Sequence, residues 1–101
     1  MANTAAPVRR QENYTLFNAT PGIYGPFELS SGQYATVATA TWGGGNVQLQ
    51  IQSIDGTTWL NATSAVNSNG FSSQLFFPEG IYQLVVTTAT AVYYEISKLK
   101  L

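Results

Sequence analysis

The sequence predicts an all-β fold: a seven- or eight-stranded antiparallel sandwich or jelly roll with an extended N-terminal arm. Short stretches that alternate apolar with polar residues recur along the chain, and turn-forming residues separate them about every ten residues. No stretch keeps the three- and four-residue apolar spacing of a helix for long enough to form one. A chain of 101 residues is one domain. We divide it into a flexible arm, residues 1–12, and a β-domain, residues 13–101.

The first half of the chain supplies the arm and four predicted strands. The arm has no apolar periodicity and contains the adjacent Arg9 and Arg10. The predicted strands cover residues 14–18, 27–29, 34–42 and 46–53. Turn residues end the first three of them: Thr-Pro-Gly at 20–22, Ser-Ser-Gly at 30–32 and three glycines at 43–45.

The second half continues the same pattern. Asp55-Gly56 is a hairpin signal, because glycine tolerates the positive φ of such turns, and the return strand lies around Trp59. The later strands are predicted at residues 71–77, 81–88 and 92–99. The turns before them are Asn-Ser-Asn-Gly at 67–70 and Pro-Glu-Gly at 78–80. Tyr82, just after the second of these turns, is expected to hydrogen-bond the preceding corner.

The stretch 46–53 has the clearest alternation. Its apolar residues point to one face, and with two residues of a later strand they form the predicted interior: Val47, Leu49, Ile51, Leu84 and Val86. The other face carries Gln48, Gln50 and Gln52. Their neutral donors and acceptors allow contact with a partner at a small desolvation cost, and a solvated face is the equal alternative.

Charge is confined to a few positions. Charged residues make up 9% of the chain, and no Lys, Arg or His occurs from Gln11 to Ser97. A surface close to neutral resists self-association poorly, so we interpret it as a surface covered in an assembly. A Thr-rich β-protein without such a role is the alternative.

The same composition argues against catalysis and ion binding. Nucleophilic triads need a base, usually His, and the chain has neither His nor Cys. The acids lie in separate strands or turns, and nothing in the sequence pairs two of them, such as Glu28 with Glu95, for glycoside hydrolysis. The Asp55 turn supplies one carboxylate, too few for a metal. We therefore predict a non-enzyme with no catalytic, cofactor or metal site, and the few cations disfavour nucleic acid. No apolar run suits a signal peptide or a membrane span.

Sugar binding is the main alternative function. Trp42 and Trp59 are candidates for an aromatic platform with Asn and Gln neighbours, and packing of both at the rim of the core is the simpler interpretation.

Three groups of residues resemble a known class of proteins. They are Val47-x-Leu49-Gln50 leading into Asp55-Gly56-Thr57-Thr58-Trp59, then Pro78-x-Gly80-x-Tyr82-x-Leu84-x-Val86, and last Tyr93-Tyr94-Glu95-Ile96. Over residues 27–99 the chain is similar to small all-β decoration (cement) proteins of tailed-bacteriophage capsids. Tail and fibre components share such strands.

The resemblance implies a non-enzymatic virion protein, made in the host cytoplasm, that binds the capsid exterior. Its partners would be the major capsid protein and further copies of itself, as a homotrimer that stabilises contacts between capsid subunits. We expect arms to reach across subunit joints, since Arg pairs well with carboxylates. The residues predicted to contact a partner are Arg9, Arg10, Gln48, Gln50, Gln52, Lys98 and Lys100.

Overall fold

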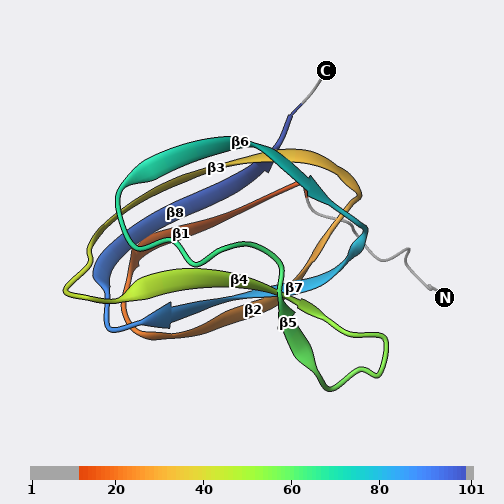
Figure 1. Ribbon diagram of the computed structural model, residues 1–101, viewed down its shortest axis with the longest axis horizontal. Helices are drawn as coiled ribbons and strands as arrows, with labels where there is room; N and C mark the ends of the chain where they lie inside the picture. The colour runs from red at the N-terminus through yellow and green to blue at the C-terminus, as the bar shows by residue number, and fades with distance from the viewer. Residues whose placement is uncertain (1–11, 100–101) are drawn as a thin grey trace, which may run out of the picture.

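Two four-stranded antiparallel sheets pack face to face in the computed structural model, which describes residues 12–99 (Figure 1). One sheet has the strand order β1-β8-β3-β6 and the other β2-β7-β4-β5. The predicted all-β class is confirmed, since the described residues contain no helix. The strands are β1 (Asn13–Ala19), β2 (Gly22–Leu29), β3 (Gly32–Thr41), β4 (Asn46–Gln52), β5 (Trp59–Asn61), β6 (Gly70–Phe77), β7 (Gly80–Thr87) and β8 (Thr90–Lys98).

The chain passes from one sheet to the other at almost every connection. Only β4 and β5 are consecutive strands that lie in the same sheet. Apart from β4 and β5, strands that pair within a sheet are therefore distant in sequence, and the paired residues farthest apart along the chain are Asn13 of β1 and Ser97 of β8.

Three of these crossings share a Gly-x-Tyr sequence. Tyr24, Tyr34 and Tyr82 each follow a glycine by two residues and each lie near the start of a strand. Each hydroxyl donates a hydrogen bond of 2.6 Å to a carbonyl oxygen four residues earlier, those of Thr20, Ser30 and Pro78. The corner expected at Tyr82 is confirmed, and two further corners of the same kind were not predicted.

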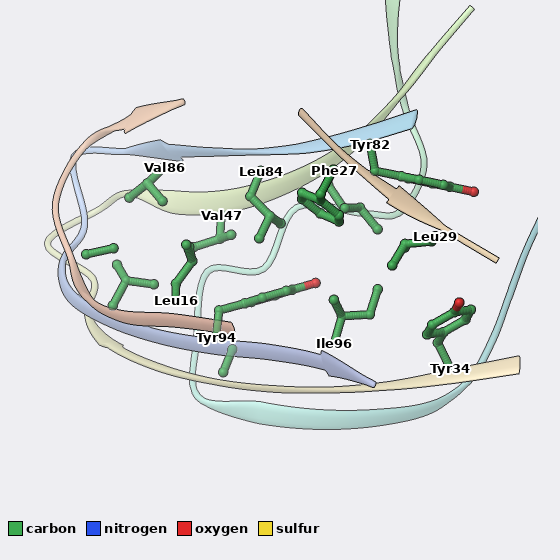
Figure 2. Packing of buried hydrophobic residues seen from close by; sticks show 14 of the residues in the cluster. Leu16, Phe27, Leu29, Tyr34, Val47, Tyr82, Leu84, Val86, Tyr94 and Ile96 are labelled. Carbon is green, nitrogen blue, oxygen red and sulfur yellow. The ribbon is translucent and has the colours of Figure 1, made fainter. Parts of the chain in front are cut away.

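Apolar side chains from both sheets fill the space between them (Figure 2). Four of the five residues predicted for the interior are buried, namely Val47, Leu49, Leu84 and Val86, and Ile51 is half-buried against them. Aromatic rings close one end of the core. The Phe77 ring lies 5.5 Å from that of Tyr34 and 5.7 Å from that of Tyr82.

Strand β2 is longer than the sequence predicted. The prediction covered only residues 27–29, and the strand also includes Gly25 and Pro26, which are unfavourable inside a strand. Strand β2 is an edge strand, and its register against β7 shifts between Tyr24 and Phe27. Pro26 lies in this bulge, where its missing N–H costs no regular ladder bond.

Candidate partner-binding surface

The outer surface of the β1-β8-β3-β6 sheet carries large apolar side chains. We call it the aromatic face and define it by Phe17, Val37, Phe71, Phe76 and Tyr93. Phe17, Phe71 and Phe76 are 76%, 67% and 72% exposed. Most soluble proteins expose single apolar residues, whereas a group of them on one face marks an interaction surface.

Contacts across the strands bring Phe17 together with Tyr93 and Val37 together with Phe71, while Phe76 pairs with Gln33 farther along β6. The rings of Phe17 and Tyr93 pack edge to face with their centres 6.3 Å apart. Val37 pairs with Phe71 on one side and with Glu95 on the other. A groove of about 280 Å³ lies over β1, β8 and β3, and its lining includes Phe17, Val37, Tyr93 and Glu95 together with Thr15 and Thr39.

Glu95 is the one charged residue at the outward positions of these four strands, within residues 12–99. It lies between Thr15 and Val37 in the pairing and is exposed. It forms no ion pair with any residue that the structure describes. A partner that covers the aromatic face therefore has to supply a cation or hydrogen-bond donors at this point.

The outer surface of the other sheet carries the predicted glutamine row, and its amides bond to their own protein. Gln48 donates to the carbonyl oxygen of Thr63 at 2.6 Å, and Gln52 donates to that of Gly56 at 3.0 Å. Gln83 donates to Gln50 at 2.8 Å, and Gln50 donates to Asn61 at 3.2 Å. These side chains join β7, β4 and β5. Partner binding by Gln48, Gln50 and Gln52 stays a prediction.

Of the predicted terminal cations, Lys98 lies in the described part of the chain, and Arg9, Arg10 and Lys100 lie outside it. The Lys98 ammonium is 3.9 Å from the Glu12 carboxylate and donates to Ser30 at 3.3 Å. Its backbone N–H donates to the Glu12 carbonyl oxygen at 2.8 Å. The two ends of the described chain are therefore side by side. Glu12 belongs to the predicted arm, and the rest of that arm lies outside the described residues.

The two tryptophans lie at opposite ends of β4. Trp42 accepts a backbone bond from Gly45, just before β4 begins, and Trp59 pairs with Gln52, where β4 ends. A strand of this length spans roughly 20 Å. Trp42 also packs on the core and donates to Asn69 at 2.9 Å. The structure does not bring the two rings together as one platform.

The Asp55 carboxylate bonds within its own turn. It accepts the backbone N–H groups of Thr57 and Thr58 at 2.8 and 2.9 Å and the Thr58 hydroxyl at 2.6 Å. These bonds, the Thr58 hydroxyl first, lower the pKa of Asp55 to about 2. Its oxygens serve the turn that joins β4 to β5.

The other acids do not assemble into a site. Glu28 is on β2 and Glu95 is on β8, so they belong to different sheets. Within residues 12–99 no three acidic, His or Cys side chains group in a way that could hold a metal ion. No helix in that part of the chain is long and apolar enough to cross a membrane.

The aromatic face was not predicted from the sequence, although the sequence contains a signal for it. Strands of this face have large apolar residues at adjacent positions, as in Leu16-Phe17 and Phe76-Phe77. Adjacent residues of a strand point to opposite faces, so two apolar neighbours place one of them outside. The contact residues that we predicted are all polar or charged, and none of them lies among these apolar pairs.

Comparison with known proteins gives no relative: no family model, curated protein or solved structure matches this chain.

Proposed function

We propose that the chain is a non-enzymatic structural protein of a bacteriophage virion. It binds the outer capsid surface, as a homotrimer, and stabilises contacts between major capsid subunits. Its fold in this proposal is an eight-stranded jelly roll with an N-terminal arm, residues 1–12. The protein is made in the host cytoplasm and acts on the particle.

The order of the strands supports this proposal. Consecutive strands alternate between the sheets at every connection except that from β4 to β5, and the sheets have the orders β1-β8-β3-β6 and β2-β7-β4-β5. Such connectivity supports a jelly roll, an architecture that viral capsid and lectin domains use. It agrees with a virion role and does not by itself separate that role from sugar binding. The separation of Trp42 from Trp59 along β4 argues against sugar binding on a platform formed by both rings.

The aromatic face is the observation that carries the proposal. Exposed Phe17, Phe71 and Phe76 on one sheet need a cover, and binding of a protein surface removes them from water. A capsid lattice repeats the same site at many positions. Several weak contacts per trimer then act together, since the first contact raises the effective concentration of the others.

The position of the termini agrees with attachment by arms. Glu12 and Lys98 are bonded to each other, so the arm and the C-terminal residues start from the same place. Arg9, Arg10, Lys98 and Lys100 are then all close in sequence to that point. We propose that they bind carboxylates of the capsid subunits.

The test is quantitative mass spectrometry of purified phage particles, with light scattering of the free protein. We expect a fixed ratio of this chain to the shell subunit in the head fraction, and trimers free or on the particle. The double variant Phe17→Ser, Phe71→Ser should lose most binding to heads. Ile23→Ser is the matched control, because Ile23 is exposed on the other sheet.

Other outcomes reject parts of this proposal. A fixed ratio in the tail fraction would assign the protein to the tail or fibre. Absence from particles, or equal loss of binding in the control, would reject the capsid role of the aromatic face. Monomers in both settings would reject the trimer.

A further inference from the structure

Tyr94 differs from the other buried tyrosines in its hydrogen bonding. The hydroxyls of Tyr34 and Tyr82 each donate to a backbone carbonyl. Tyr94 is 2% exposed, and its hydroxyl makes no hydrogen bond with any residue in the described range 12–99. Buried hydroxyl groups almost always have a partner, so this one requires an explanation.

A cavity of about 380 Å³ lies beside Tyr94. Its floor is the inner side of the β1-β8-β3-β6 sheet, where Thr36, Ser72, Leu75 and Tyr94 line it. Figure 2 shows the Tyr94 hydroxyl pointing away from β8 into the space between the sheets. A cavity of roughly 150 Å³ holds a benzene ring, so this one has room for a larger molecule.

An arch of residues 62–66, in the connection from β5 to β6, forms the roof. In Figure 1 this connection passes across the opening between the two sheets. The arch is tied to β4 at both ends: Ala62 donates to Leu49 at 2.9 Å, and Val66 exchanges two bonds of 2.8 Å with Val47. Gln48 holds its middle through the Thr63 carbonyl. The cavity is therefore preformed.

The lining sets the chemistry of the occupant. Hydroxyls of Thr, Ser and Tyr alternate with Ala, Val and Leu side chains, and no charged residue is among them. Burial raises the pKa of Tyr94, so its hydroxyl stays protonated and is a donor at neutral pH. An ion would lose its hydration here without gaining a counter-charge. Ser64, Ala65 and Ser72 are exposed, so the cavity is open to solvent.

We propose that this cavity binds a small uncharged molecule with an apolar body and one hydrogen-bond acceptor, which the Tyr94 hydroxyl contacts. The site is independent of the aromatic face, which lies on the outer side of the same sheet. It would give the protein a ligand in addition to its macromolecular partner.

Titration with cyclohexanone, followed by ¹H–¹⁵N NMR, tests the proposal. Cyclohexanone has one carbonyl acceptor on an apolar ring. We expect saturable shifts that centre on the amides of Thr36, Ala65, Ser72 and Tyr94. Cyclohexanecarboxylate, of similar size but charged, should give none of them. Tyr94→Phe should weaken binding roughly threefold to tenfold, the loss of one hydrogen bond. Tyr93→Phe is the matched control, because Tyr93 points outward and this variant should not change the affinity for cyclohexanone.

Ser72→Leu places a larger side chain in the cavity from β6 and should abolish the chemical-shift changes. This variant tests the proposal if Tyr94→Phe fails to fold. The proposal is overturned if cyclohexanone gives no saturable shift up to its solubility, since the cavity would then hold water alone. Binding that Tyr94→Phe and Ser72→Leu leave unchanged, or shifts confined to the aromatic face, would also overturn it.

Discussion

The Tyr82 hydroxyl donates a hydrogen bond of 2.6 Å to the carbonyl oxygen of Pro78, which fixes the angle at which the chain enters β7. The Tyr82 ring is buried against Phe77 and Phe27. One side chain therefore both packs in the core and satisfies the backbone of the turn before it. The same relationship recurs at Tyr24 and Tyr34.

Replacing Tyr82 with Phe removes this hydrogen bond and keeps the ring. We expect the free energy of unfolding to fall by about 1–2 kcal/mol, because the Pro78 carbonyl loses a donor in a partly buried bond. Urea denaturation measures the change. Tyr93→Phe is the control, since the Tyr93 hydroxyl is on an exposed ring, and it should change stability by less than about 0.5 kcal/mol. Equal effects of the two variants would contradict the role of the corner.

The stability of the fold should fall as the pH rises above 10. Burial, and then the nearby Tyr34, raise the pKa of Tyr82 from 10.0 to about 12. The unfolded chain loses this proton near pH 10 while the folded chain keeps it, so the unfolded state binds fewer protons between pH 10 and 12. Stability is then complete below pH 10 and declines across that range. Unfolding curves at pH 8 to 12 test this, and Tyr82→Phe should make the decline less steep. A flat profile up to pH 12 would rule out the mechanism.

Leu49 is the strongest test of the predicted core. It lies on β4, is 1% exposed and belongs to the cluster that both sheets build. Leu49→Ala should lower the free energy of unfolding by about 2–5 kcal/mol, from lost apolar burial and the cavity left behind. Ile54→Ala is the control, because Ile54 is fully exposed in the loop after β4. A loss below about 0.5 kcal/mol in Leu49→Ala would mean that the face of β4 with Leu49 does not pack in the core.

Gly45 has no space for a side chain. A Cβ atom there would lie 2.0 Å from the Thr87 carbonyl oxygen and 2.5 Å from the Ala89 nitrogen, both of them backbone atoms. Gly45→Ala should therefore prevent the normal approach of β4 to the end of β7, and the thermal midpoint should drop by roughly ten degrees or more, on the order of 2–3 kcal/mol. Gly44→Ala meets no atom within 4 Å but keeps a φ of +84°. It should cost only about 1 kcal/mol. Thermal unfolding of both variants tests this prediction, and a larger loss of stability in Gly44→Ala than in Gly45→Ala would contradict it.

The sequence was informative where one strand has one apolar face. Alternation in β4 predicted both its burial and its outward glutamines, since the pattern follows from geometry within the strand. It was uninformative about the partners of each strand, because pairing depends on contacts between residues far apart. The first part of β2 was not predicted, because the bulge at Gly25 and Pro26 interrupts the strand pattern.

The candidate site was harder to predict than the fold. The predicted contact residues are polar, whereas the structure shows the glutamines bonded within the protein and the exposed surface made of Phe, Val and Tyr. Adjacent apolar residues such as Leu16-Phe17 indicate a strand, but which of the two faces outward depends on how the sheets pack. The cavity beside Tyr94 depends on the path of the 62–66 arch, which no local pattern encodes.

The order of the strands in the sheets also determines when each strand can pair during synthesis. Strand β1 is the first of the eight to leave the ribosome, yet its one partner in the sheet is β8, the last of them. Only the β4–β5 hairpin can pair early between neighbours in sequence. Proteins dominated by such distant pairings fold in milliseconds to seconds, far more slowly than helical bundles. During synthesis, β1 therefore has no strand partner in its sheet until β8 has been made.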